Sequence, residues 1–394
     1  MTSTGASTAD IFKQALGNGT KQPPASTAPA SGGHVGGFLV CLDVPEATEF
    51  GIDYEVFRTG PKFQGVKFVP LGVHFVVFRS REQEHGIRQG FFVNIERHGQ
   101  VVVREWSAEK EELGPPRPGL NVEHLERAVL SFQLDSGLGP YPKQHAKVWQ
   151  RLSKYISTSV LQRCGVDLGS LILPGDVEDA QTAAEDGGVI PFFPDLPRTI
   201  RFTRLMRRNT AEMTVQERTA YHFDKSAMVL ELLSSVYQQD WKELLGELQL
   251  AFIAFLQLSS LTAMEQWKQM LLMLCSCEQA LTTHVELFRA FLKLLRTQLE
   301  QIPVDFFQDE LTGDNFLRPC MASLLELLRD AECPPELGSM GEQLTGLLQS
   351  RFHLDLGTEL LDDDEFAPVV VAPDELDADA ANMQVAMSFL RPRQ

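Results

Sequence analysis

The run Val73-His74-Phe75-Val76-Val77-Phe78 decides the first half of the fold, because so dense a series of β-branched and aromatic side chains is typical of a β-strand. Glycine and proline interrupt the sequence on both sides of this run at short intervals, which indicates turns between strands. Three similar runs lie nearby: Phe38-Leu39-Val40-Cys41-Leu42, Phe91-Phe92-Val93-Asn94-Ile95 and Val101-Val102-Val103. The sequence therefore predicts a β-rich, antiparallel N-terminal domain over residues 37–210.

Helical patterns follow the strands within this domain, over residues 121–132 and 143–161. The turn sequence Gly137-Leu138-Gly139-Pro140-Tyr141-Pro142 separates them. We expect these helices to cover the sheet. The polar stretch 174–188 is expected to form a loop.

After about Thr214 the apolar residues recur every three or four positions, as in Leu244, Leu245, Leu248 and Phe252. This period indicates amphipathic helices. Similar patterns bring the number of helices to about six, and they cover residues 264–274, 285–299, 315–330 and 336–352. We therefore predict an α+β fold, in which the β-rich domain is followed by an all-α helical C-terminal domain over residues 211–354.

The two ends of the chain differ in composition from both domains. Residues 1–36 are rich in Ser, Thr, Ala, Gly and Pro, which predicts a disordered leader. Residues 355–394 are predicted to form an acidic extended tail, because ten acidic residues and no Lys or Arg lie between positions 354 and 390. The formal net charge of −18 opposes attraction to nucleic-acid phosphates, so we expect a protein partner.

The sequence carries no Gly-x-Ser-x-Gly elbow, phosphate-binding Gly-Lys-Ser loop, His pair at metal-binding spacing or Cys-x-x-Cys motif. We therefore expect no catalytic residue, no cofactor and no metal, and hence not an enzyme. In particular, we expect no His, Cys or Ser beside an acid in a cleft. A hydrolase or transferase with a dispersed site is the alternative, because distant residues can assemble a catalytic group.

The six cysteines are scattered, which fits a reducing compartment. Cys275-Ser276-Cys277 lies in a leucine-rich stretch that is expected to be helical, so these two thiols are interpreted as small buried apolar groups. The start of the chain lacks the pattern of a signal peptide, and no apolar run is long enough to span a bilayer. We expect no membrane association.

One basic strip opposes the acidity of the chain, and it is a candidate contact for phosphate groups or an acidic partner. Only Phe202 offers a ring for base stacking there, so the alternative is that charged residues flank a buried strand or linker. We expect direct RNA binding to be weak or absent. The strip consists of Arg198, Arg201, Arg204, Arg207 and Arg208.

A short apolar segment interrupts the acidic tail between Asp362-Asp363-Asp364-Glu365 and Asp374-Glu375. Its consecutive valines favour extended backbone, and Pro368 and Pro373 exclude a helix. This is the pattern of a strand offered to the sheet edge of a partner, although it also fits a last strand docked on this chain's own first domain. The candidate partner-binding residues are Glu365, Phe366, Ala367, Pro368, Val369, Val370 and Val371.

Several motifs along residues 38–371 closely resemble the Aar-two family of U5 snRNP assembly factors. The motifs follow the family order: Leu42-Asp43-Val44-Pro45, Thr48-Glu49-Phe50-Gly51-Ile52-Asp53-Tyr54, Gly60-Pro61-Lys62-Phe63-Gln64-Gly65-Val66-Lys67, Gly72-Val73-His74-Phe75, Leu245-Gly246-Glu247-Leu248-Gln249, Ile302-Pro303-Val304-Asp305-Phe306-Phe307 and Ala367-Pro368-Val369-Val370-Val371. The long Ser/Thr/Pro-rich leader and residues 204–217 depart from the family pattern.

The resemblance implies a non-enzymatic assembly chaperone of the U5 snRNP in pre-mRNA splicing, present in cytoplasm and nucleus. Such a protein is expected to bind the large U5 scaffold protein, which has RNase H-like and Jab/MPN-like domains, and to block premature association of the spliceosomal RNA helicase. The resemblance also implies a helical domain similar to VHS modules. VHS-like bundles read peptide signals as well, so a trafficking adaptor is a second alternative.

Within the family-like opening, Glu49, Gly51 and Asp53 are expected to have a structural role. Gly51 suits a turn, and the two carboxylates can accept backbone N–H groups there.

Overall fold

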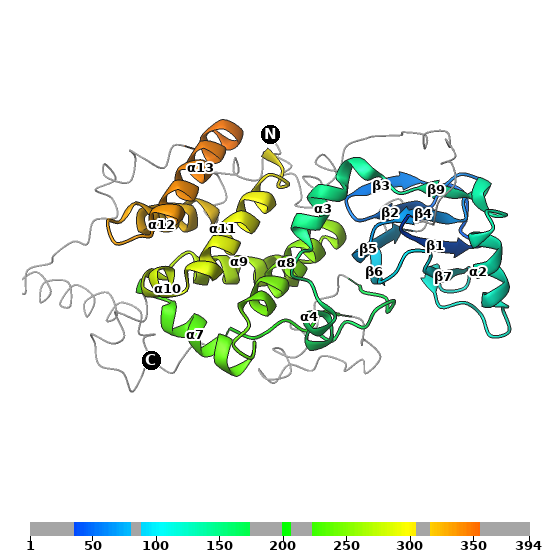
Figure 1. Ribbon diagram of the computed structural model, residues 1–394, viewed down its shortest axis with the longest axis horizontal. Helices are drawn as coiled ribbons and strands as arrows, with labels where there is room; N and C mark the ends of the chain where they lie inside the picture. The colour runs from blue at the N-terminus through cyan, green and yellow to red at the C-terminus, as the bar shows by residue number, and fades with distance from the viewer. Residues whose placement is uncertain (1–34, 80–87, 174–198, 206–222, 305–315, 355–394) are drawn as a thin grey trace, which may run out of the picture.

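The computed structural model describes residues 35–79, 88–173, 199–205, 223–304 and 316–354 (Figure 1). It has a β-rich N-terminal part and a helical C-terminal part, which confirms the predicted α+β class. The predicted leader up to residue 34, the predicted loop 174–188 and the predicted acidic tail lie outside the described residues.

Nine strands form two sheets in the described residues. The five-stranded sheet has the order β8 (Glu112–Gly114), β7 (Val101–Ser107), β1 (Gly37–Leu42), β4 (Gly65–Val69), β9 (Leu138–Pro140). The four-stranded sheet has the order β3 (Glu55–Arg58), β2 (Glu49–Ile52), β5 (Gly72–Arg79), β6 (Gln89–Ile95). The prediction of a purely antiparallel domain is wrong, because β1 pairs with β7, and β4 with β9, in parallel. Each of these pairs is separated in sequence by long excursions through other elements, as a parallel pair requires.

The two sheets pack face to face, and the alternation of side chains along each strand decides which core they enter. In β1, Leu39 and Cys41 point into the core between the sheets, where they join Val76 and Phe78 of β5. Phe38 belongs instead to a separate core on the outer face of the five-stranded sheet. That face is covered by α2 (Val122–Leu130), as the helical pattern over residues 121–132 predicted.

The outer face of the four-stranded sheet is covered by helices from both parts of the chain. Phe75 and Val77 of β5 share a core with Trp149 of α3 (Ala146–Leu152) and Val160 of α4 (Thr158–Arg163). The same core contains Leu250, Ile253 and Leu258 of α8 (Trp241–Leu258), which belongs to the helical part. The β-rich and helical parts are therefore joined by a continuous apolar core.

The single helical pattern over residues 143–161 corresponds to three elements: η2 (Lys143–His145), α3 and α4. The break between α3 and α4 has a local cause. The Ser157 side chain caps α4 by accepting a hydrogen bond from the Val160 N–H, and its own backbone is extended. A serine with this conformation starts a new helix and cannot continue the previous one.

The described helical part contains seven helices. They are α7 (Ser226–Ser235), α8, α9 (Leu261–Leu274), α10 (Glu278–Thr283), α11 (Val285–Leu299), α12 (Leu317–Arg329) and α13 (Pro335–Phe352). Every residue of α8 from Leu244 to Leu258 is buried, so α8 is the central helix of the molecule (Figure 1). None of the helices in the described ranges is both long and apolar enough to cross a bilayer.

Cys275 and Cys277 are both buried, but they do not lie within one helix as expected. Cys275 is the residue that ends α9, and Cys277 is the residue that precedes α10. The short connection between these two helices places both thiols in the core of the helical part.

Candidate functional site

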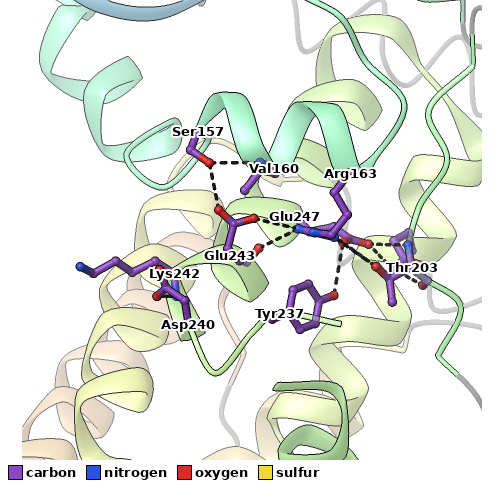
Figure 2. Close-up of polar contacts among 10 residues, drawn as sticks. Ser157, Val160, Arg163, Thr203, Tyr237, Asp240, Lys242, Glu243 and Glu247 are labelled. Carbon is purple, nitrogen blue, oxygen red and sulfur yellow. Dashed lines mark hydrogen bonds and ion pairs between the residues drawn. The ribbon is translucent and has the colours of Figure 1, made fainter. Parts of the chain in front are cut away.

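The most extensive buried polar cluster among the described residues surrounds Glu247 of α8 (Figure 2). The side chain of Glu247 is fully buried. Its Oε1 accepts hydrogen bonds from the Thr203 N–H at 2.7 Å and from Gln266 Nε2 at 3.1 Å. Its Oε2 accepts from the Thr203 hydroxyl at 2.8 Å, from the Tyr237 hydroxyl at 3.2 Å and from Arg163 Nη1. Both oxygens are therefore fully engaged by protein donors.

Arg163 supplies the positive charge of this cluster from α4. Its guanidinium forms ion pairs with Glu247 and, at 3.6 Å, with Glu243, and it stacks over the Tyr237 ring at 4.6 Å. Burial opposes the charge on Arg163, but the charge and hydrogen bond of Glu247 keep the pKa of Arg163 above its usual value. Burial, reinforced by Glu247, raises the pKa of Tyr237, so the phenol keeps its proton and remains a donor.

The residues next to Glu247 in α8 also hold the preceding chain. Gln249 accepts from the Tyr155 N–H at 2.7 Å and donates to the Arg151 carbonyl at 2.9 Å. A Cβ atom on Gly246 would lie 2.4 Å from the Tyr155 carbonyl oxygen, so only glycine permits this close approach. Within the motif Leu245-Gly246-Glu247-Leu248-Gln249, Gly246 and Gln249 therefore fasten α8 to the end of α3 and the segment that follows it, and Glu247 fastens α8 to α4 through Arg163.

A second buried cluster joins Asp53, His74 and Tyr141 in the β-rich part. Asp53 Oδ2 accepts from the Tyr141 hydroxyl and lies 2.7 Å from His74 Nδ1, while Oδ1 accepts from the Phe75 N–H at 3.0 Å. His74 Nε2 lies 2.8 Å from the Pro70 carbonyl oxygen. Both ring nitrogens of His74 therefore lie within hydrogen-bond distance of an oxygen atom of the protein. Burial and the Asp53 charge raise the pKa of Tyr141, so it also remains a donor.

This second cluster places a histidine beside an acid. The pair is not in a cleft, however, since His74 is 3% exposed and Asp53 is 1% exposed. A catalytic base needs a free lone pair within reach of a substrate. In this cluster the carboxylate and imidazole are occupied by Tyr141, Phe75 and Pro70. The cluster therefore has a structural role: it connects the β2–β3 turn to β5 and to Tyr141.

The predicted structural residues Glu49, Gly51 and Asp53 lie on or just after β2. Glu49 forms ion pairs with Arg79 at 2.5 Å and with Arg88 at 2.7 Å. Asp53 occupies the β2–β3 turn with φ of 57°. Gly51 lies within β2 and not in the expected turn; a Cβ atom there would come within 2.7 Å of Val77 and 2.8 Å of Val56. Glycine is needed at this position because side chains of both neighbouring strands cross over it.

The basic strip is described only in part, because Arg198, Arg207 and Arg208 lie outside the described residues. Arg201 and Arg204 are exposed, and the Arg201 N–H donates to the Cys164 carbonyl at 2.9 Å. Phe202 is half-buried and packs against the core shared by the two parts, so its ring is not presented for base stacking. The tail residues Glu365, Phe366, Ala367, Pro368, Val369, Val370 and Val371 also lie outside the described residues.

Burial favours the protonated form of four cysteine thiols in the described ranges. Burial raises the pKa of Cys41 to about 12, and it also raises the pKa of Cys164, Cys275 and Cys277. A thiol becomes a strong nucleophile or metal ligand only as the thiolate. Within the described ranges, no group of three or more His, Cys, Asp or Glu side chains is placed to hold a metal ion.

These features define a class of protein: a β-sandwich and a helical bundle fastened into one body, in which the buried polar groups serve the junction and the sheet. Two family models match the chain in order, the AAR2 N-terminal domain over residues 35–166 and the AAR2 C-terminal repeat region over residues 202–357. The chain belongs to the AAR2 family, which confirms the resemblance noted in the sequence. Family membership supports a role in splicing.

The curated relatives cover most of the chain. The proteins named Protein AAR2 homolog from Mus musculus and Homo sapiens are each 32% identical over 364 residues, which is 85% of this chain and 93% of the relative. Protein AAR2 homolog of Caenorhabditis elegans is 30% identical over 347 residues, which is 82% of this chain and 96% of the relative. The similarity therefore extends over both parts of the fold.

Proposed function

We propose that this protein is a non-enzymatic assembly factor of the U5 snRNP. In this role it binds the RNase H-like and Jab/MPN-like domains of the large U5 scaffold protein. This binding delays association of the spliceosomal RNA helicase with the scaffold. The observation that carries the proposal is the match of both parts of the chain, in order, to the AAR2 family. We place this activity in the cytoplasm and nucleus.

The fold suits a protein that holds another protein. A binding surface that is already rigid loses little conformational entropy on association. The shared core between β5 and α8, together with the Glu247 cluster, fixes the β-rich part against the helical part. A surface that extends over both parts is therefore preorganised for a large partner.

The main competition experiment uses the full chain, the scaffold's C-terminal region and the helicase. We expect saturating amounts of this protein to reduce helicase binding to the scaffold, because both occupy the same region. A stable ternary complex with unchanged helicase affinity would contradict the blocking role. Affinity purification with mass spectrometry should recover U5 snRNP proteins.

The segment Glu365–Val371 is proposed to add a strand to the scaffold, since its valines favour extended backbone between acidic flanks. Side chains alternate along a strand, so Val369 and Val371 face one side and Val370 the other. Burying a valine contributes about 1.5–3 kcal/mol, so Val→Asp on the pocket side should weaken scaffold binding about tenfold or more. The same change at the opposite-facing position is the matched control and should have a smaller effect.

Direct RNA binding is proposed to be weak, because the net charge of −18 repels nucleic-acid phosphates. Any binding through the exposed Arg201 and Arg204 is electrostatic and should therefore fall as the salt concentration rises. Filter binding of U5 RNA at two salt concentrations tests this. Tight binding that persists at high salt would show that the basic strip is a nucleic-acid site.

A further inference from the structure

The outer edge of β3 has unpaired backbone groups among the described residues. β2 and β3 are joined by a two-residue turn, Asp53-Tyr54, with Ile52 opposite Glu55. In such a hairpin alternate residues bond to the partner strand, so Glu55 and Phe57 face β2. The N–H and C=O groups of Val56 and Arg58 then face outward. No backbone hydrogen bond from the described residues reaches them.

Aromatic side chains at this edge are incompletely covered. Phe57 of β3 and Phe63 of the following turn are only half-buried. Their rings pack against buried Phe50, with centroid distances of 5.5 Å and 4.9 Å, and against each other at 5.8 Å. An added strand would extend the sheet and bury these two rings further, which would strengthen the core between the sheets.

The chain leaves the helical part within reach of this edge. Tyr54, in the β2–β3 turn, packs against the core of the helical part. Burial raises the pKa of the Tyr54 phenol, and the charge of Arg351, in the last turn of α13, opposes this rise. Arg351 is fixed in position by donating to the Ile302 carbonyl at 2.8 Å. Residues 355–365 follow, and eleven residues extend up to about 36 Å at roughly 3.3 Å per residue. The next residues are the apolar segment of the tail.

We propose that residues 366–371 of the same chain add to β3 as an extra strand in the free protein. The segment supplies extended backbone to Val56 and Arg58 and apolar side chains to Phe57 and Phe63. Acidic residues flank it on both sides, so either strand direction brings negative charge near exposed Arg58. β3 is thus an internal docking site for the tail.

The docking on β3 does not require the proposed function. Only the role of the docked tail rests on the proposed function, in which the same segment binds the scaffold. Pairing with β3 then holds the tail strand until the scaffold displaces it. A segment that serves two sheet edges is protected from aggregation while the partner is absent. The scaffold must compete against an intramolecular contact, which is favoured by its high effective concentration.

Amide hydrogen exchange of the full chain, measured by NMR without any scaffold, tests the docking. The Val56 and Arg58 amides should exchange at least tenfold more slowly in the full chain than in a variant lacking residues 362–394. The Phe57 amide, which bonds to β2, is the internal control and should remain protected in both. A variant lacking only residues 376–394 is the matched truncation, and it should retain the slow exchange.

A peptide of residues 362–375 added to the truncated chain should restore protection at Val56 and Arg58. Equal exchange of these amides in the full and truncated chains would overturn the proposal. Protection that depends on protein concentration would also overturn it, because the occupant would then be a second copy. Loss of scaffold binding with normal Val56 protection would instead contradict only the proposed function.

Discussion

A Glu247→Gln substitution keeps the shape of the side chain but removes its charge. The amide cannot accept from all five donors on the four surrounding residues as the carboxylate does, and Arg163 loses its buried counter-ion. Removing one partner of a buried ion pair costs about 3–5 kcal/mol. We expect the free energy of unfolding to fall by this amount, measured by chemical denaturation.

Glu243→Gln is the matched control for that substitution, because Glu243 lies one turn earlier on α8 and also pairs with Arg163. Its contact with the guanidinium is longer, at 3.6 Å, and its side chain is 19% exposed. We expect a loss below about 1 kcal/mol, as for a pair open to solvent. Equal effects of the two substitutions would show that Glu247 is not the centre of the cluster.

Thiol reactivity separates Cys333 from the other five cysteines. Cys333 is half-buried, whereas Cys41, Cys164, Cys275, Cys277 and Cys320 are buried. With a pKa of about 12, Cys41 is ionised in only about one molecule in ten thousand at pH 8. We therefore expect one rapidly modified thiol in the folded protein at pH 8, measured with a chromogenic disulfide reagent.

The Cys333→Ser variant should lose that rapid phase, while the remaining thiols react at the rate at which the structure opens. Burial and Asp330 raise the pKa of Cys333, so its reaction should accelerate as the pH rises. Several rapid thiols in the Cys333→Ser variant would contradict the buried placement of the others.

At the scale of single residues, the sequence predicted the role of a residue better than the residues that it contacts. Asp53 was expected to have a structural role, which agrees with its buried position beside His74 of β5. The Asp53–His74 contact spans 21 residues and the Asp53–Tyr141 contact spans 88, so no local pattern could reveal them. Glu247 was missed for a similar reason: a glutamate in a leucine-rich helix is ordinarily placed on the exposed face. Its four partners come from different segments.

At the scale of elements, α8 offers a test of how closely it approaches the α3–α4 connection. Gly246→Ala would place a Cβ atom 2.4 Å from the Tyr155 carbonyl and 2.7 Å from Val160. The backbone must move apart, so we expect a loss of about 1–3 kcal/mol in the free energy of unfolding. Thermal or chemical denaturation measures this loss.

Gly346→Ala in α13 is the opposite case, because nothing lies within 4 Å of the new Cβ atom. An exposed helical glycine replaced by alanine gains about 0.5–1 kcal/mol. The two substitutions should therefore have opposite signs. A stabilising Gly246→Ala substitution would contradict the close approach.

The element predictions succeeded where an element has apolar surroundings along its whole length. The run from Val73 to Phe78 has apolar neighbours on both faces. One face packs in the core shared with the five-stranded sheet and the other in the core shared with α8, so the apolar character of the run was evident in the sequence. The short strands β2 and β3 were missed, because polar residues and a two-residue turn interrupt their pattern. β9 was read as a turn, since Gly139 and Pro140 are turn residues in isolation. Its pairing with β4 is a tertiary contact that overrides local preference.

At the scale of the whole molecule, the sequence divides into a β-rich part and a helical part, but the two parts are stabilised by one shared apolar core. Leu250, Ile253 and Leu258 of α8 are buried against the sheet and against α3 and α4. Separating the two parts would expose these side chains together with Phe75 and Phe92. That surface resembles the interior of a domain more than a contact between independent domains.

The two parts should consequently unfold in a single transition, and Ile253→Ala tests this because Ile253 is a helical-part residue in the core shared with the sheet. Truncating a buried isoleucine costs about 2–5 kcal/mol. We expect this variant to lower the melting temperature of methyl signals in both parts equally, with Val76 reporting on the sandwich and Leu295 on the bundle. Calorimetry of the unmodified chain should give a van't Hoff enthalpy equal to the calorimetric enthalpy, as for one cooperative unit. Melting of Leu295 while Val76 remains ordered would show that the shared core does not couple the two parts, and that the surface proposed to hold the scaffold is not rigid.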